Sequence, residues 1–134
     1  ITPHLYNNID AGIAAMYKTQ LQNTKEFLSK GELIYKNFTQ LVMQNYNHTR
    51  NVAWYAKKLK ISNIHLCTTV KKVTGNTCAE IIAHMVIMDA KSQLKSTHLS
   101  IQEISNSLNF ANTSFFGKYF KRYVGMGPQE YRNS

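Results

Sequence analysis

The feature that most constrains this chain is an internal repeat, because one stretch of sequence occurs twice. Residues 52–82 reappear as residues 101–132, at an offset of 49 positions before a central turn and 50 positions after it. The second copy therefore has one extra residue in its turn. The matching positions are Leu59, Lys60 and Ile61 with Leu108, Asn109 and Phe110, and then Lys71, Lys72, Gly75 and Glu80 with Lys121, Arg122, Gly125 and Glu130.

Apolar residues recur mostly at intervals of three and four, so we predict an all-α fold. Ser62 is a suitable N-cap for a helix over 63–73 that Gly75 ends. Capping boxes at Thr77-x-x-Glu80 and Ser100-x-x-Glu103 predict helices over 77–95 and 101–108. Further helices are expected over 52–59, 113–124 and, after Pro128, 129–132. The side chains expected to face inward are Ala53, Ala56 and Leu59, then Ile81, Ile82, Ala83, Met85 and Met88, and finally Phe116 and Phe120, with Phe115 half-buried.

Residues 1–48 form a separate segment in this interpretation. Two apolar stripes predict two amphipathic helices, the second following a break at Lys30-Gly31. Because the chain opens with Ile1 rather than Met, we expect a piece of a longer protein. The stripes comprise Ile9, Ile13, Met16 and Tyr17, and then Ile34, Phe38, Leu41, Val42 and Tyr46.

The positive charge is concentrated after residue 48. The whole chain has 16 Lys and Arg against 7 Asp and Glu, which gives a formal charge of +9. Residues 1–48 have a balance of +1, and residues 49–134 have a balance of +8. A basic domain beside a near-neutral segment is typical of a protein that binds a polyanion. We therefore place the domain boundaries at 1–48 for a helical linker or dimerisation segment and 49–134 for a nucleic-acid-binding domain.

Each copy of the repeat has the order helix, turn, helix, which is the unit that places its second helix in the major groove of DNA. We expect a first unit over 49–76, a connecting helix over 77–95 and a second unit over 100–134. Two such units on one rigid helix could reach successive major grooves, roughly 34 Å apart.

The repeat also resembles a known family. The stretch Ser-Ile-Gln-Glu-Ile-Ser-Asn-Ser-Leu-Asn-Phe from Ser100 to Phe110, followed by Ser114 to Arg132 with its Gly-Met-Gly-Pro-Gln-Glu-Tyr-Arg end, is similar to the C-terminal signature of the AraC/XylS family of bacterial transcription regulators. The first copy, from Asn51 to Gly75, looks like the same family. The resemblance covers about residues 49–132 and implies a sequence-specific, DNA-binding transcription factor, such as an activator, with a sensor domain upstream.

The resemblance implies which residues read DNA. In the first unit, Ile64, Cys67 and Thr68 fall where the family reads base edges, and His65 lies on the same exposed side. In the second unit the matching face has Thr113, Ser114, Gly117 and Lys118, of which Lys118 is the leading candidate. Candidates for phosphate contacts are Lys71, Lys72, Lys121 and Arg122.

The second turn departs from the AraC/XylS family pattern at two positions. Asn109 stands where the family commonly has Gly, at a position where a positive φ is expected and Asn is tolerated. Ala111 stands where a Ser or Asp cap is usual, so we expect Asn112 or Thr113 to cap the following helix.

Other classes of function have little support. No Ser-His-Asp order, phosphate loop or pair of carboxylates occurs, so we expect no enzyme activity. No metal site or cofactor is expected, because His65 and Cys67 are not three or four residues apart on their helix. Cys67 and Cys78 are expected to be free thiols in a reducing cytoplasm. No apolar run is long enough to span a bilayer, so no membrane is expected as a partner.

The expected partners are double-stranded DNA, RNA polymerase and a second copy of the chain, which would dimerise through residues 1–48 or an upstream domain. Two alternatives stay open. One is a nonspecific architectural DNA binder, because the side chains at the base-reading positions are small, namely Ile64, Cys67, Thr68, Thr113 and Ser114. The other is a helical protein-interaction module whose basic surface is incidental, although such a module needs no duplicated recognition helix.

Overall fold

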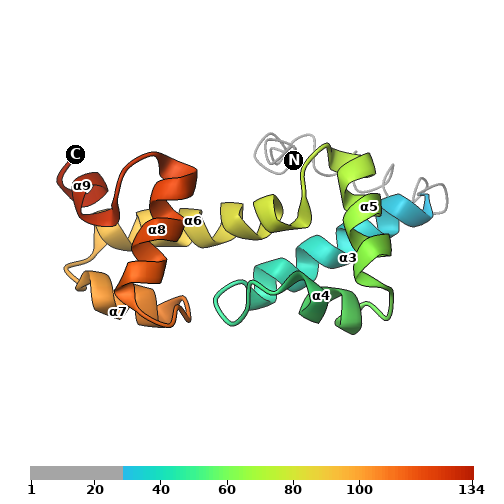
Figure 1. Cartoon of the computed structure of the whole chain (residues 1–134), viewed down its shortest axis with the longest axis horizontal. Helices are drawn as coiled ribbons and strands as arrows, with labels where there is room; N and C mark the ends of the chain where they lie inside the picture. The colour runs from blue at the N-terminus through green and yellow to red at the C-terminus, as the bar shows by residue number, and fades with distance from the viewer. Residues whose placement is uncertain (1–28) are drawn as a thin grey trace, which may run out of the picture.

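The computed structural model describes residues 29–134, and this part of the chain consists of seven α-helices without any strand. Figure 1 shows a central helix, α6 (Cys78–Ser96), with the other helices grouped around its two ends. The expected all-α architecture of two helical units on one connecting helix is confirmed. The stripe from Ile9 to Tyr17 lies outside the described residues. The helices are α3 (Lys30–Asn45), α4 (Val52–Lys58), α5 (Asn63–Thr74), α6 (Cys78–Ser96), α7 (Ile101–Ser107), α8 (Thr113–Val124) and α9 (Pro128–Asn133).

The repeat of the sequence is a repeat of backbone structure. Lys60 and Asn109 are 49 residues apart, and both have a φ of 60° in the turn of their unit. Gly75 and Gly125, 50 residues apart, both end their helix in the left-handed conformation. Glycine adopts this conformation without the steric penalty that a Cβ imposes. The additional residue of the second turn is Ala111, which precedes the N-cap Asn112. The expected positive φ of Asn109 and the expected cap are therefore confirmed.

Helix α6 supplies the core of both units, since it packs against α3 and α5 and also against α7, α8 and α9. It begins at a capping box in which Glu80 and Thr77 satisfy each other's backbone amides. Met88, which we expected to be buried, is 57% exposed. Buried residues recur at intervals of four along α6, so the buried face turns gradually around the helix. Met88 therefore lies on the exposed side. The buried residues are Cys78, Ile81, Ile82, Ala83, Val86, Ile87, Ala90 and Leu94.

Helix α3 belongs to the core of the first unit. Phe38 and Val42 are fully buried, and the ring of Phe38 packs edge-on against Tyr55 of α4 at 5.7 Å between centroids. Ile34, Leu41 and Tyr46 pack beside them, so the second apolar stripe is confirmed. The core of the first unit therefore extends into the segment that we assigned to a linker.

The expected break at Lys30-Gly31 is wrong, because α3 already begins at Lys30, after the N-cap Ser29. Gly31 lies where α3 approaches α5 closely. A Cβ added at Gly31 would lie 3.3 Å from Cγ2 of Val73 and 3.4 Å from Cγ2 of Thr69. The glycine thus lets the α3 backbone pack against the Thr69 and Val73 side chains of α5.

In α4, the expected inward position of Ala53 is also wrong, because Ala53 is exposed and Tyr55 is fully buried. Tyr55 donates its hydroxyl to the carbonyl oxygen of Thr49 (2.9 Å), which meets the requirement that a buried hydroxyl find a partner. Burial raises the pKa of Tyr55 to about 12. The ring of Tyr55, which also contacts Phe38, fills the centre of the first unit. A side chain as small as that of Ala53 would leave this space empty.

We predict that Phe38→Ala lowers the free energy of unfolding by about 3–5 kcal/mol, because it removes a fully buried ring. Met43→Ala on the same helix is the control, since Met43 is 61% exposed and its loss should change stability by less than about 0.5 kcal/mol. Denaturant unfolding of both variants measures the difference. Equal effects would contradict the placement of α3 in the core.

Candidate nucleic-acid interface

Helices α5 and α8 present the same pattern of exposure. Each residue from 63 to 75 is buried, partly buried or exposed in the same way as the residue 50 positions later. Leu66 and Val70 of α5 are fully buried, as are Phe116 and Phe120 of α8. Each helix is thus held by two large apolar side chains, while positions 64, 65 and 68 of α5 and positions 114, 115 and 118 of α8 are exposed.

In α5 the structure places three of the four predicted base-contact residues on the open side. Ile64 is 79% exposed, which is unusual for a side chain of its size and apolar character. His65, Thr68 and Lys71 are exposed as well. Cys67 is only partly exposed, and its thiol donates to Oδ1 of Asn63 at 3.5 Å.

Two shallow grooves border this stripe of α5. One groove lies between α5 and the first turn of α3, and His65, Thr68 and Lys72 line it from the α5 side. The other lies between α5 and the N-terminal ends of α4 and α6, and Cys67, Thr68 and Lys71 line it. Cys78 forms part of this second groove, and burial together with the neighbouring Cys67 thiol raises its pKa to about 12. Cys78 is therefore a protonated structural thiol rather than a nucleophile.

In α8, Thr113, Ser114 and Lys118 are exposed and Gly117 is partly exposed. The expectation that Phe115 is half-buried is wrong, because its side chain is 57% exposed. Phe116 and Phe120 already occupy the buried side, so Phe115 projects from the helix beside Ser114. No atom lies within 4 Å of a Cβ added at Gly117, so internal packing does not require this glycine.

The four basic residues predicted to contact phosphates are exposed in the last turns of α5 and α8. Their positive charge also favours the C-terminal end of each helix. Nζ of Lys71 donates to the carbonyl oxygen of Gly75 at 2.9 Å, so part of its role is to cap α5. Arg122 lies over the ring of Tyr123, with 5.5 Å between its guanidinium carbon and the ring centroid. These residues are Lys71, Lys72, Lys121 and Arg122.

The two helices have similar directions at opposite ends of α6, as Figure 1 shows. Helix α6 has 19 residues, so it is about 28 Å long at about 1.5 Å per residue. This length is close to the roughly 34 Å between successive major grooves on one face of DNA. The connecting helix thus carries two similarly exposed helices near its two ends and has a length of the same order as this spacing.

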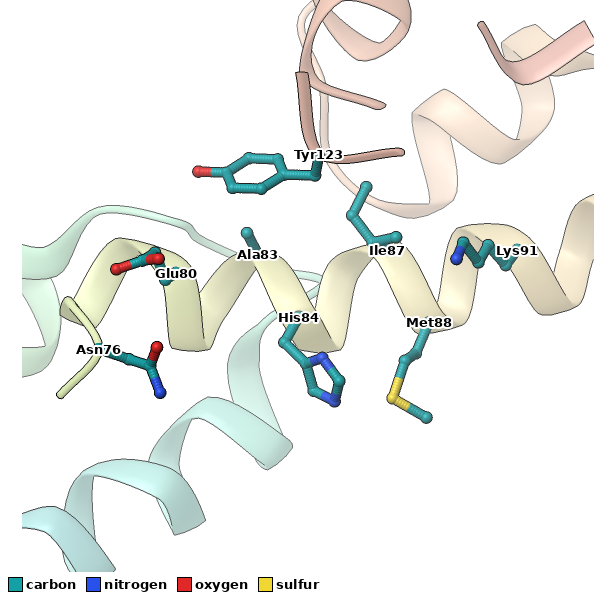
Figure 2. Close-up of a pocket in the computed structure, with 8 residues that line it drawn as sticks. All are labelled: Asn76, Glu80, Ala83, His84, Ile87, Met88, Lys91 and Tyr123. Atoms are coloured by element: carbon teal, nitrogen blue, oxygen red, sulfur yellow. The ribbon is translucent and has the colours of Figure 1, made fainter. Parts of the chain in front are cut away.

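An open groove follows α6 between the C-terminal ends of α5 and α8 (Figure 2). Tyr123 reaches from α8 over Ala83 and Ile87, whereas His84 and Met88 point to the other side of α6. The lining combines apolar, acidic and basic groups, and it does not converge on one point as a catalytic constellation would. Among residues 29–134, no three His, Cys, Asp or Glu side chains are placed to share a metal ion.

None of the helices between residues 29 and 134 has both the length and the hydropathy needed to cross a lipid bilayer.

Sequence comparisons identify bacterial regulators as relatives. The "Msm operon regulatory protein" of Streptococcus mutans is 30% identical over 112 residues, which is 84% of this chain and 40% of that protein. The "Raffinose operon transcriptional regulatory protein RafR" of Pediococcus pentosaceus is 28% identical over 69% of this chain and 34% of that protein. The chain thus spans well under half the length of these relatives.

Solved structures share the fold. The C-terminal domain of AraT, a response regulator from Geobacillus stearothermophilus, matches with a TM-score of 0.71 and 22% identity, over 78% of this chain and 88% of that one. The DNA-binding domain of AdpA, solved in complex with a target DNA, matches with a TM-score of 0.66 and 16% identity, over 74% of this chain and 89% of that one.

A family model described as "Helix-turn-helix domain" matches residues 55–134, which include most of both units. The relatives that the sequence comparisons identify are named as transcription regulators, in keeping with a DNA-binding helix-turn-helix domain. The chain belongs to the AraC/XylS family of transcription regulators and contains the DNA-binding helix-turn-helix domain of that family.

Proposed function

We propose that α5 and α8 enter two successive major grooves on one face of double-stranded DNA and read a two-part sequence. The observation that supports this most directly is the matching exposure of the two helices at the ends of a connecting helix about 28 Å long. A nonspecific binder needs a basic surface but not two matched helices with their apolar sides buried. Reading by two helices therefore fits the geometry better than attraction of charge alone.

The two helices read bases by different chemistry in this proposal. Ile64 and the methyl group of Thr68 contact thymine methyl groups, and His65 and Cys67 border them. In α8, Lys118 donates to guanine acceptors, and Thr113 and Ser114 offer hydroxyls to neighbouring bases. The space around Gly117 lets the α8 backbone approach the bases closely.

Phe115 joins this group of base-contacting residues because its ring is exposed beside Ser114 near the start of α8. The N-terminal residues of a recognition helix are those that approach base edges. A large exposed ring at this position gains from burial in a major groove and contacts the methyl group of thymine. We propose it as a base contact that sequence reasoning missed.

Phosphate contacts by Lys71, Lys72, Lys121 and Arg122 supply most of the affinity. Each neutralised phosphate releases counterions, so the affinity falls steeply as salt increases. These contacts fix the position of α5 and α8 on the duplex without reading its sequence. The carbonyl of Gly75 takes one of the three donors of Lys71 Nζ, which leaves two for such a contact.

The complete regulator would act in the cytoplasm, bind RNA polymerase and form a homodimer. These proposals rest on family membership, and residues 1–48 or an upstream domain would supply the dimer contact. We propose residues 49–134 as the part that contacts DNA, with α3 as the structural support of the first unit.

Selection of bound duplexes from a random pool tests the proposed function. The whole chain should be used at moderate salt, because α3 contributes to the core. We expect enrichment of two short motifs about one helical turn apart. Salt-sensitive binding without any motif would favour an architectural role, and absence of binding would favour a protein-interaction module.

We predict that the double variant Lys118→Glu and Lys121→Glu binds the selected duplex about 100-fold more weakly, since one base contact and one phosphate contact are each typically worth about 1–3 kcal/mol. The double variant Lys36→Glu and Lys91→Glu has the same net charge and is the control. Fluorescence anisotropy at several salt concentrations measures both. An equal loss in the two variants would mean that α8 contributes only general charge.

We predict that Phe115→Ala weakens binding of the selected duplex about tenfold and leaves the free energy of unfolding within about 0.5 kcal/mol of the unchanged chain. The neighbouring Phe116→Ala should instead cost about 3–5 kcal/mol of stability, because Phe116 is fully buried. Thermal unfolding and anisotropy separate the two effects. Unchanged binding by Phe115→Ala would remove Phe115 from the reading surface.

A further inference from the structure

Arg50 forms a direct contact between the two units, apart from their connection through α6. It precedes α4 in the first unit, and its Nη1 donates to the carbonyl oxygen of Leu108 in the second unit at 2.9 Å. Its guanidinium carbon lies 3.6 Å from the centroid of the Phe110 ring and 5.6 Å from that of Tyr119. The side chain therefore combines a hydrogen bond with stacking on an aromatic face, which the planar guanidinium favours.

Further hydrogen bonds surround this contact. The Asn109 side-chain amide donates to the carbonyl oxygen of His48, so the turn of the second unit is bound to the α3–α4 loop. In the same region Tyr46 donates to Asp89 of α6 at 2.8 Å, and Gln93 donates both to Asp89 and to Ser107 of α7. In Figure 1 the α3–α4 loop lies beside the α7–α8 turn, on the lower side of α6.

This contact is not a requirement of the helix-turn-helix unit itself. At the offset of 49, the counterpart of Arg50 in the second copy is Leu99, which cannot make the same contact. The counterpart of Asn109 is Lys60, which has the same φ of 60°. The backbone turn is thus common to both copies, whereas the bonds between units come from side chains that only one copy has.

Arg50 is also poorly placed to bind DNA phosphate itself. Its side chain is partly buried, and this burial lowers the pKa of the guanidinium. Its donors face the Leu108 carbonyl and its plane faces the Phe110 ring. On the opposite side of α6, the open groove under Tyr123 leaves room between the C-terminal ends of α5 and α8 (Figure 2).

We propose that Arg50, with Asn109, is a positioning residue that fixes the second unit against the first and so determines which spacing between the two half-sites the protein accepts. The part of this inference that concerns spacing rests on the proposed function. Without the contact, the two units are joined by α6 alone, and the open groove allows their angle to vary. A protein with a variable angle tolerates more spacings and loses preorganisation for the best one.

The variants that test this proposal are chosen from the contacts of Arg50 and from the backbone conformation of Asn109. Arg50→Ala removes the stacking and the bond to Leu108, and Asn109→Gly removes the bond to His48 while keeping a residue that accepts positive φ. Lys60→Gly is the matched control, since it makes the same kind of change in the equivalent turn of the first unit, outside this contact. Arg50→Lys keeps a cation near Phe110 and should restore part of the function of Arg50.

The first measurement is made on the free, whole chain by backbone residual dipolar couplings. We expect the couplings of the two units to fit one common alignment in the unchanged chain and in Lys60→Gly. In the double variant Arg50→Ala and Asn109→Gly the two units should need different alignments. One common alignment in the double variant would overturn the inference, whatever the protein does with DNA.

The second measurement is the affinity for a series of duplexes in which one to three base pairs are inserted into or removed from the selected spacer. We expect the preference for the selected spacing to fall about tenfold in the double variant, since preorganisation is lost, and to recover in part with Arg50→Lys. Altered alignment with an unchanged spacing preference would overturn the role in specificity. If the unchanged chain selected no two-part site, the proposed function would be wrong, and the dipolar couplings would still decide the role of Arg50.

Discussion

The whole arrangement depends on the burial of one helix in two cores. Helix α6 packs against α3 and α5 near one end and against α7, α8 and α9 near the other, and eight of its residues are buried. Each unit is too small to bury much surface alone. Because both units pack against the same helix, α6 carries the surfaces of α5 and α8 near its two ends. The position of the recognition helices is thus a consequence of core packing.

Much of the fold could be predicted from the sequence, because local chemistry specifies it. Capping boxes, the glycines after α5 and α8 and the repeat itself predicted the helices and the turn of Asn109. The predictions of buried residues were wrong where tertiary packing, rather than local sequence, decides which side chains are buried. Met88 lies on an apolar stripe but turns away from both cores, and Tyr55 rather than Ala53 fills the centre of the first unit. No local pattern shows that α3 packs against the repeat.

The candidate site was predictable to a similar extent. Periodicity and resemblance led to the exposed stripes of α5 and α8, because a recognition helix has a buried side that the apolar positions reveal. Phe115 was missed since an aromatic residue is usually buried, and only the structure shows that its two neighbours already fill the core. Arg50 has no sequence signal at all. Its partners are about 60 positions away, and isolated long-range contacts leave no period in a sequence.

The close crossing at Gly31 has a consequence for how the two units respond to the rest of the chain. At Gly31 the backbone of α3 packs directly against the Thr69 and Val73 side chains of α5, so a shift of α3 acts on α5 directly. The second unit receives the same shift through α6 and through the contacts of Arg50 and Asn109. A displacement at the start of α3 is therefore transmitted unequally, directly to α5 and indirectly to α8. The two copies of the repeat therefore differ in how closely they are coupled to α3, although their backbone folds are alike.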